Sequence, residues 1–241
     1  MKKVLLVSGC SFTDKNFISD YYPKLDTSWP KWPELLAKKL DMDCINLGKM
    51  GSGNEYIYTS LLDQIMKMNP SDIGLIIPAW TGAGRKDWKV KGKWKNVELM
   101  PYSAYVATNG DIDWRIERSM TYYYSLQEIC KNNNLPLKQF QMLPIFRGYD
   151  WDPIKEIHED GRKNFRKKHL QTIYNNSFFN KIDDSFIGWP TESSLGGFSI
   201  KMNALGAFTE ESYEWTISKR DNHPNAKGQE KIMEFIYDRL G

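Results

Sequence analysis

The sequence predicts an α/β protein built around a mainly parallel sheet. Over residues 1–80, short apolar runs alternate with segments whose apolar residues keep helical spacing. Residues 73–79 are almost all apolar, as expected of a strand that is covered on both faces. An amphipathic helix follows Asn225, and its apolar face consists of Ile232, Phe235, Ile236 and Leu240. Such an alternation of strands and helices favours a sheet with helices packed against it.

The individual strands and helices are predicted from the length of the apolar runs and from the spacing of the apolar residues. Short apolar runs predict strands at residues 4–7, 44–47, 73–79 and 137–142. Apolar residues at helical spacing predict helices at residues 32–40, 54–68 and 116–130, in addition to the last helix.

One domain is expected to span residues 1–241, because the chain shows no internal repeat and no linker-like tract. Two insertions are expected in it, at residues 84–115 and 147–215. The first is rich in Lys and Trp, and the second contains a predicted basic helix at residues 153–170.

Composition argues against several classes of protein. The net charge of +3 is too small to indicate a nucleic-acid or membrane partner, and no apolar run approaches the roughly 18 residues of a transmembrane helix. Cys10, Cys44 and Cys130 are too scattered for a disulfide framework or a CxxC metal site. His158 and His169 have no metal-ligand spacing. We therefore expect no metal and no cofactor.

The opening MKKVLLVSGC has the basic start and the small residues that precede the cysteine of a lipoprotein signal. A signal needs an apolar run of roughly 7–15 residues, whereas only residues 4–7 are continuously apolar here. The segment is therefore interpreted as the first strand. The protein is expected in the cytoplasm, or in an assembled virion, where scattered cysteines are also tolerated.

Ser11 follows the first strand, at the edge of a parallel sheet where α/β proteins bind their ligands. It could be a nucleophile if a general base lies nearby, or it could simply cap the next segment. His223 precedes the last helix, and Asp221 lies two residues before it. A carboxylate so close could orient the imidazole toward a hydroxyl, as in a catalytic triad. The alternative is an Asx turn that leads into the helix.

A glycine-rich turn at residues 46–54 joins the second strand to the next helix and contains Gly48, Gly51 and Gly53. Such a turn presents backbone N–H groups at a helix start, where an oxyanion would be stabilised. The same feature could bind a phosphate, although the GxxGxG pattern is not that of dinucleotide-binding folds.

These segments together resemble the SGNH (GDSL-like) hydrolases, and most of all those of tailed bacteriophages. Ser11 matches the nucleophile of that family, with Cys10 in place of the aspartate of the Gly-Asp-Ser signature. Gly51 matches the glycine that donates to the oxyanion, and His223 with the following Pro-Asn matches the final block.

Asp221 lies two residues before the histidine, not the commoner three, which is similar to SGNH-type polysaccharide O-acetyltransferases and some viral members. The resemblance covers about residues 1–85 and 215–241. It implies a flavodoxin-like three-layer α/β/α sandwich and a Ser-His-Asp mechanism in which the N–H groups of Ser11 and Gly51 hold the oxyanion.

The third strand ends differently from that family, which has Gly-x-Asn-Asp where this chain has PAWTGAGR. The oxyanion hole therefore lacks its asparagine, and Thr81 or Arg85 would have to replace it. Loss of one such donor typically lowers the rate by about 10²–10³. Cys10 is an alternative nucleophile, but neighbouring residues at a strand end point in opposite directions, so Cys10 should face the core.

Trp80 and Trp189 are candidate substrate-binding residues, because flat aromatic faces suit sugar rings. The basic residues at 89, 91, 93 and 95 alternate with other residues, which is typical of the solvated face of one edge strand and not of a nucleic-acid site.

The sequence thus predicts a serine esterase that removes acetyl or other acyl groups from a glycan. An O-acyltransferase is a close variant, because an acyl-enzyme can pass its acyl group to a sugar hydroxyl. The alternative of another class is a binding or virion structural protein that keeps the fold with little or no turnover. A serine closed off from solvent, or a histidine out of its reach, would favour that alternative.

Overall fold

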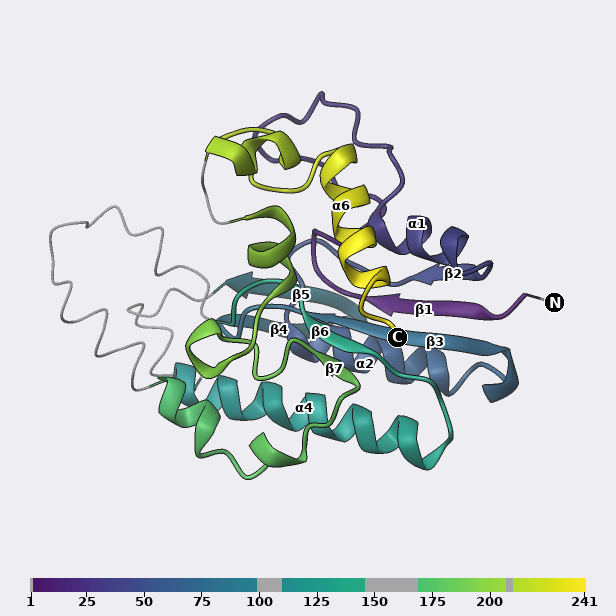
Figure 1. Cartoon of the computed structure of the whole chain (residues 1–241), viewed down its shortest axis with the longest axis vertical. Helices are drawn as coiled ribbons and strands as arrows, with labels where there is room; N and C mark the ends of the chain where they lie inside the picture. Colours follow the sequence, from purple (N-terminus) through teal and green to yellow (C-terminus); the bar gives the residue numbers. More distant parts are fainter. Residues whose placement is uncertain (1, 99–109, 146–168, 207–209) are drawn as a thin grey trace, which may run out of the picture.

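The computed structural model describes residues 2–98, 110–145, 169–206 and 210–241. Its centre is a five-stranded parallel sheet with the order β2-β1-β3-β6-β7 (Figure 1). The strands are β1 (Val4–Ser8), β2 (Asp43–Asn46), β3 (Ile73–Trp80), β6 (Gln139–Gln141) and β7 (Phe186–Ile187). Numbered along this sheet alone, the order is 2-1-3-4-5, which is that of flavodoxin-like folds. The predicted fold class is confirmed.

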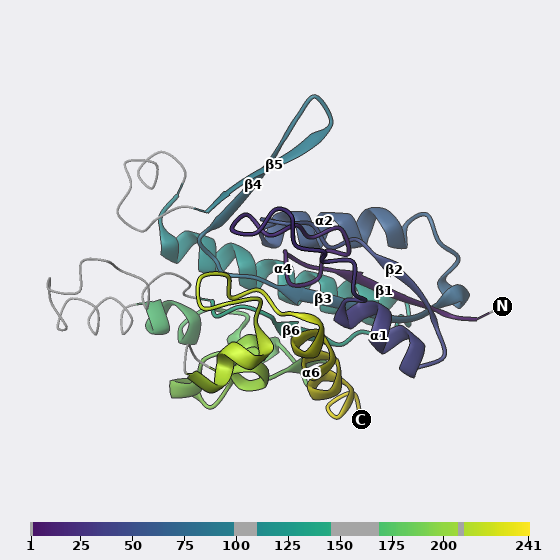
Figure 2. The same cartoon turned by 90° about the horizontal axis from the view of Figure 1, so that it is seen from above.

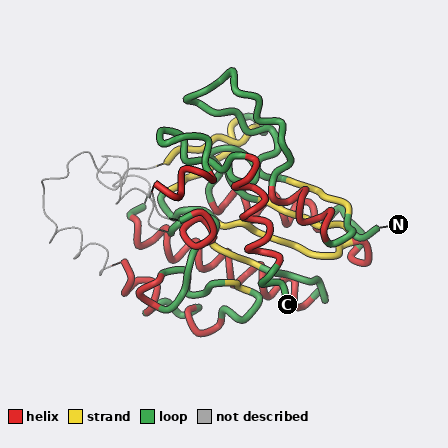
Figure 3. Tube along the Cα trace, turned by 45° about the horizontal axis from the view of Figure 1, so that its top comes forward, coloured by secondary structure: helices red, strands yellow, loops and turns green. Residues whose placement is uncertain are grey.

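Helices cover both faces of the sheet (Figure 3). Helices α1 (Trp32–Lys39) and α6 (Ala226–Tyr237) contact each other on one face, and α2 (Asn54–Ile65) and α4 (Ile112–Asn132) contact each other on the opposite face. The chain therefore forms three layers, with one hydrophobic core on each side of the sheet.

The pleat of the strands explains why they are apolar throughout. Leu5 and Val7 of β1 lie in the core beneath α1 and α6, whereas Leu6 lies in the core beneath α2 and α4. Successive side chains of a strand point to opposite faces, so a strand covered on both sides needs apolar residues at every position.

Most predicted elements differ from the observed ones only at their ends. Helix α2 ends at Ile65, three residues earlier than predicted, and α4 begins at Ile112, four residues earlier. Asp111 explains the early start of α4, because its side chain accepts a hydrogen bond of 2.9 Å from the N–H of Trp114 and caps the helix. Strand β7 has only two residues and was not predicted.

The first predicted insertion contains an antiparallel hairpin of β4 (Arg85–Val90) and β5 (Lys93–Glu98), which projects from the body of the molecule (Figure 2). The prediction of one lysine-lined strand is wrong here. Lys91 and Gly92 both have positive φ, 48° and 76°, and turn the chain back on itself. The alternating lysines are therefore divided between two paired strands.

Part of the second predicted insertion lies outside the described residues. This holds for His158 and for residues 153–168 of the predicted basic helix, whereas residues 169–174 are helical. Within the described ranges, no helix is both long enough and apolar enough to cross a membrane. The organisation of residues 1–241 as one domain with two insertions stays a prediction.

Candidate active site

Ser11 lies just beyond the carboxyl end of β1, beside the point where the strand order reverses between β1 and β3. Open α/β sheets bind their ligands at such switch points. A tight turn follows the strand, in which the N–H groups of Thr13 and Asp14 donate to the carbonyl of Cys10 at 2.8 and 3.1 Å. Cys10 itself is fully buried in the core, which confirms that it faces away from the site.

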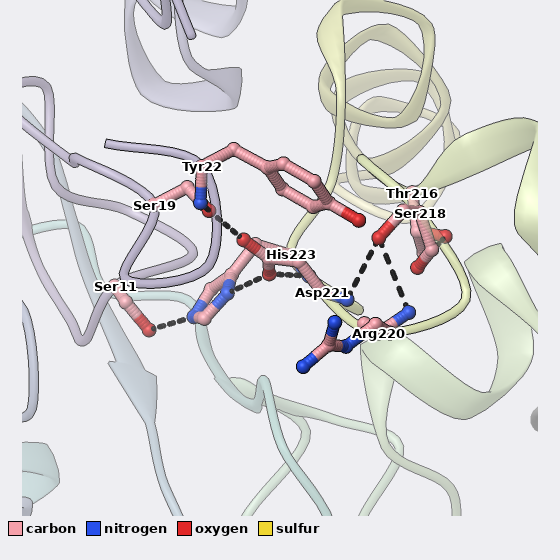
Figure 4. A network of polar contacts seen from close by, with 8 residues as sticks. All are labelled: Ser11, Ser19, Tyr22, Thr216, Ser218, Arg220, Asp221 and His223. Carbon is pink, nitrogen blue, oxygen red and sulfur yellow. Dashed lines mark hydrogen bonds and ion pairs between the residues drawn. The ribbon is translucent and has the colours of Figure 1, made fainter. Parts of the chain in front are cut away.

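Ser11, His223 and Asp221 form a continuous chain of contacts (Figure 4). Nε2 of His223 lies 2.9 Å from Oγ of Ser11, and Nδ1 lies 2.6 Å from Oδ1 of Asp221. An ionised carboxylate can only accept hydrogen bonds, so Nδ1 is the nitrogen that carries the proton. Nε2 of the neutral ring is then free to accept the hydroxyl proton of Ser11, as a general base would.

Asp221 is held ionised in a buried position, with only 1% of its surface exposed. Burial by itself would raise the pKa of this carboxyl group, but hydrogen bonds from His223 and Ser19 outweigh it and lower the pKa below its usual range. Ser19 donates its hydroxyl to Oδ2 (Figure 4), so the two carboxylate oxygens have different partners. The N–H of His223 adds a bond of 3.1 Å to Oδ1.

The loop before α6 fixes the position of His223 through its backbone. The N–H of Ile217 donates to the carbonyl of His223 at 2.9 Å, and Thr216 and Pro224 form an isolated antiparallel bridge. The side chain of Asn225 then caps α6 by accepting a bond of 3.0 Å from the N–H of Gly228. The Asx turn expected as an alternative is present as well, because Asp221 accepts from the N–H of His223.

Two aromatic rings confine the imidazole. The ring of Phe17 lies 4.4 Å from that of His223 between centroids, and the ring of Phe12 lies 5.3 Å away. His223 keeps 21% of its side-chain surface exposed, while only 4% of the surface of Ser11 is exposed. The base is thus partly exposed to solvent, whereas Ser11 is almost fully covered.

The glycine turn lies against the Ser11 loop through side-chain and backbone hydrogen bonds. Asp14 accepts from the N–H of Met50 at 2.8 Å, and the N–H of Lys49 donates to the carbonyl of Gly9 at 2.9 Å. Gly51 has φ of 77°, and a Cβ at this position would lie 2.4 Å from Oδ1 of Asn96 on β5. The positive φ favours glycine at residue 51, and a Cβ there would also require the flexible side chain of Asn96 to move.

Two backbone N–H groups at this site have no acceptor among the described residues. In the described part of the chain, neither the N–H of Ser11 nor that of Gly51 donates a hydrogen bond. These are the two groups that the sequence resemblance assigns to an oxyanion, and that assignment stays a prediction.

The two candidates for a third donor are placed less favourably. The N–H of Thr81 already donates to Oδ1 of Asn54 at 2.8 Å, and its hydroxyl is buried without a partner among the described residues. Arg85 donates from Nη1 to the carbonyl of Ser52 at 3.0 Å, so its charge lies beside the glycine turn.

The two candidate substrate-binding tryptophans lie in different surroundings. Trp80 is fully buried in the core, and its Nε1 donates to the side chain of Gln139 at 3.1 Å. The prediction that Trp80 offers its ring to a substrate is wrong, because neither face of the ring is open. Trp189 is partly buried, packs against the rings of Phe179 and Phe186, and donates to the carbonyl of Phe179 at 3.1 Å.

Several residues that support the site carried no recognisable signal in the sequence. Ser19 and Asp14 lie in an irregular loop, and their partners are distant along the chain. The sequence pattern indicates Asn54 only as the start of a helix. In the structure its side chain accepts from the N–H of Thr81 and donates to the carbonyl of Thr81 at 3.1 Å, and so ties α2 to the end of β3. Asp87 on β4 accepts from the N–H of Gly53 at 2.8 Å, which a strand prediction does not reveal.

Comparison with known proteins gives a likeness of fold only. No family model and no curated protein matches the chain. Among solved structures, the chain is similar to the psychrotrophic esterase EstA from Pseudoalteromonas sp., with 13% identity, a TM-score of 0.45, and coverage of 99% of this chain and 96% of that chain. It is also similar to a variant of Axe2, an acetyl xylan esterase from Geobacillus stearothermophilus, with 12% identity, a TM-score of 0.48, and coverage of 99% and 94%. Since the identities are so low and the TM-scores lie below 0.5, the activity has to be argued from the geometry of the site.

Proposed function

We propose that this chain is a serine ester hydrolase of the SGNH type that removes acyl groups, in the simplest case acetyl groups, from a glycan. The observation that carries the proposal is the contact chain from Oγ of Ser11 through His223 to the buried carboxylate of Asp221. A serine hydroxyl becomes a useful nucleophile only with a base in hydrogen-bond reach, and the base in turn needs a group that orients it.

In the proposed reaction, Oγ of Ser11 attacks the ester carbonyl carbon while its proton passes to Nε2 of His223. The negative oxygen of the tetrahedral intermediate accepts hydrogen bonds from the N–H groups of Ser11 and Gly51. The intermediate then collapses, the C–O bond to the sugar breaks, and the leaving sugar oxygen takes the proton from His223. Water hydrolyses the acyl-enzyme by the same steps, with His223 again as the base.

A polar cavity near the glycine turn supports a sugar over a lipid chain as the substrate. A cavity of about 390 Å³ lies next to the glycine turn, and its lining includes Glu55, Arg85, Asp87 and Arg118. Charged walls of this kind bind hydroxyl-rich ligands, whereas a long acyl chain would need an apolar channel.

A fluorophosphonate probe tests the proposal, because it reacts only with an activated serine. We expect labelling of the folded protein at Ser11, located by peptide mass spectrometry, and loss of labelling in Ser11→Ala and in His223→Ala. Cys10→Ala is the matched control for the neighbouring nucleophile and should keep the label. Release of acetate from acetylated glycans would then identify the substrate.

A second candidate is a binding or virion protein with little or no turnover. One observation favours it, namely that only 4% of the surface of Ser11 is exposed. Absence of labelling in protein that circular dichroism shows to be folded would contradict the hydrolase proposal and support this candidate.

A further inference from the structure

The β4–β5 hairpin has two faces with different surroundings. Directly paired residues of antiparallel strands lie on the same face. Asp87 and its partner Asn96 lie on the inner face, where they bind the N–H of Gly53 at 2.8 Å and the carbonyl of Met50 at 3.4 Å. Trp94 lies on the same face and packs edge-on against Tyr56, with 5.4 Å between ring centroids. The inner face therefore holds the hairpin against the glycine turn and α2.

The outer face consists of three cross-strand pairs, each of one lysine and one apolar residue: Lys86 with Val97, Trp88 with Lys95, and Val90 with Lys93. We call these six residues the basic face. Its apolar members are unusually open, with 38% of Trp88, 46% of Val90 and 39% of Val97 exposed. Figure 2 shows the hairpin standing clear of the sheet and helices.

Positive charge is concentrated on this hairpin. Residues 88–97 contain four lysines and no acidic residue, in a chain whose net charge is only +3. Lys86 also lines the cavity beside the glycine turn, together with Arg85, Arg115 and Arg118. The lining of this cavity also includes Glu55 and Asp87, so the excess of positive charge lies on the strands and turn of the hairpin.

We propose that the basic face binds an acidic glycan chain, so that the polymer that is deacylated carries carboxylate or sulfate groups. This inference rests on the proposed function. Lys93 and Lys95 are two residues apart on one strand, about 7 Å, so they can bind acidic groups of successive sugars. Trp88 and the valines offer apolar contact to the C–H faces of the same sugars.

The composition of the basic face favours a glycan over the other polyanions. Platforms for single-stranded nucleic acid stack successive bases on several aromatic side chains, whereas Trp88 is the single aromatic residue of this face. Pairing with a second copy through the hairpin is opposed by the lysines, which repel each other along a sheet edge.

Binding is tested with the full-length Ser11→Ala protein, which cannot turn over an ester. We expect it to bind an oligogalacturonide, with an affinity that falls as salt is added, and not to bind a neutral xylo-oligosaccharide of equal length. The double variant Lys93→Glu, Lys95→Glu should bind the acidic chain at least about tenfold more weakly. Lys67→Glu, Lys131→Glu makes the same change of charge on exposed lysines away from the hairpin and should bind normally.

Three outcomes would overturn the inference: equal binding of the neutral and acidic chains, unchanged binding in the Lys93/Lys95 variant, or preferential binding of single-stranded DNA of equal charge. Failure of the proposed function is recognised separately, by absence of fluorophosphonate labelling at Ser11. If the proposed function and the binding of an acidic glycan are both correct, the Lys93/Lys95 variant should show a raised KM for an acetylated acidic glycan and unchanged kinetics with a small acetyl ester.

Discussion

Ser19 is expected to control the candidate base although it does not touch it. Its hydroxyl is fully buried, donates to Oδ2 of Asp221, and accepts a bond of 3.0 Å from the N–H of Tyr22. In Ser19→Ala, Oδ2 would remain buried without that donor. A hydrogen bond to a charged group contributes about 1.5–3 kcal/mol, and this energy limits the loss of kcat/KM to about 10- to 100-fold.

The same substitution should change how stability depends on pH. The Ser19 bond favours the ionised form of Asp221, so its loss raises the pKa of that carboxyl group relative to the native protein. Because the native pKa is lowered, the contribution of Asp221 to the free energy of unfolding is present above the ordinary pKa of about 4 and is lost as pH falls through the native pKa. The stability difference between the native protein and Ser19→Ala should thus be largest near neutral pH and shrink in acid.

Hydrolysis of a small acetyl ester across pH, combined with urea unfolding at several pH values, measures both effects. Ser60→Ala is the matched control, because the hydroxyl of Ser60 bonds only neutral groups, Oγ of Ser8 at 2.7 Å and the carbonyl of Ile57 at 3.1 Å. It should cost about 1 kcal/mol of stability and leave kcat unchanged. If Ser19→Ala kept kcat/KM within twofold of the native value, Ser19 would have no role in orienting Asp221.

Three further substitutions test other parts of the site. Gly51→Ala should lower kcat more than it raises KM and should lower the melting temperature, because φ is 77° and the new Cβ would meet Oδ1 of Asn96 at 2.4 Å; unchanged ester kinetics would show that this turn does not hold the oxyanion. Asn54→Ala should cost about 1–3 kcal/mol in urea unfolding, because it leaves the buried backbone N–H of Thr81 without its acceptor, whereas the carbonyl of Thr81 keeps the amide donor of Gln141 at 2.7 Å; Asn69→Ala, at an exposed 3₁₀ turn, is the control. Thr81→Val removes a buried hydroxyl that has no partner among the described residues, so a fall in kcat of about 10²-fold or more would identify it as the third oxyanion donor, and no change would exclude it.

The local part of the fold could be predicted because each strand and helix leaves its own pattern in the sequence. Residues 73–79 are apolar because their side chains alternate between two cores. The cap of α6 involves only Asn225 and Gly228, which are three residues apart in the sequence. The sequence pattern did not reveal the hairpin, because the alternation of lysines continues without a break through the turn at Lys91 and Gly92. Strand β7 was missed because two residues carry no periodicity.

The site shows the same division between local and long-range information. Asp221 and His223 are two residues apart, so their contact could be expected from chain geometry. The partnership of Ser19 with Asp221 joins residues 202 positions apart, and nothing near Ser19 distinguishes it from any loop serine. The sequence also does not reveal which side chains are buried, since a tryptophan such as Trp80 at a strand end can face either a ligand or the core.

Asn54 does not replace the asparagine that is missing after β3. Its amide, from the start of α2, binds the N–H and the carbonyl of Thr81 and also donates to the hydroxyl of Ser119 at 3.0 Å, so both of its N–H donors are already used. Under the proposed function, stabilisation of an oxyanion would then depend on the N–H groups of Ser11 and Gly51. A site with two donors can still accelerate ester cleavage, but the missing donor corresponds to about 10²–10³ in rate. A slow enzyme gains most from a mechanism that keeps its substrate nearby, because a tethered polymer presents each ester repeatedly to the same serine.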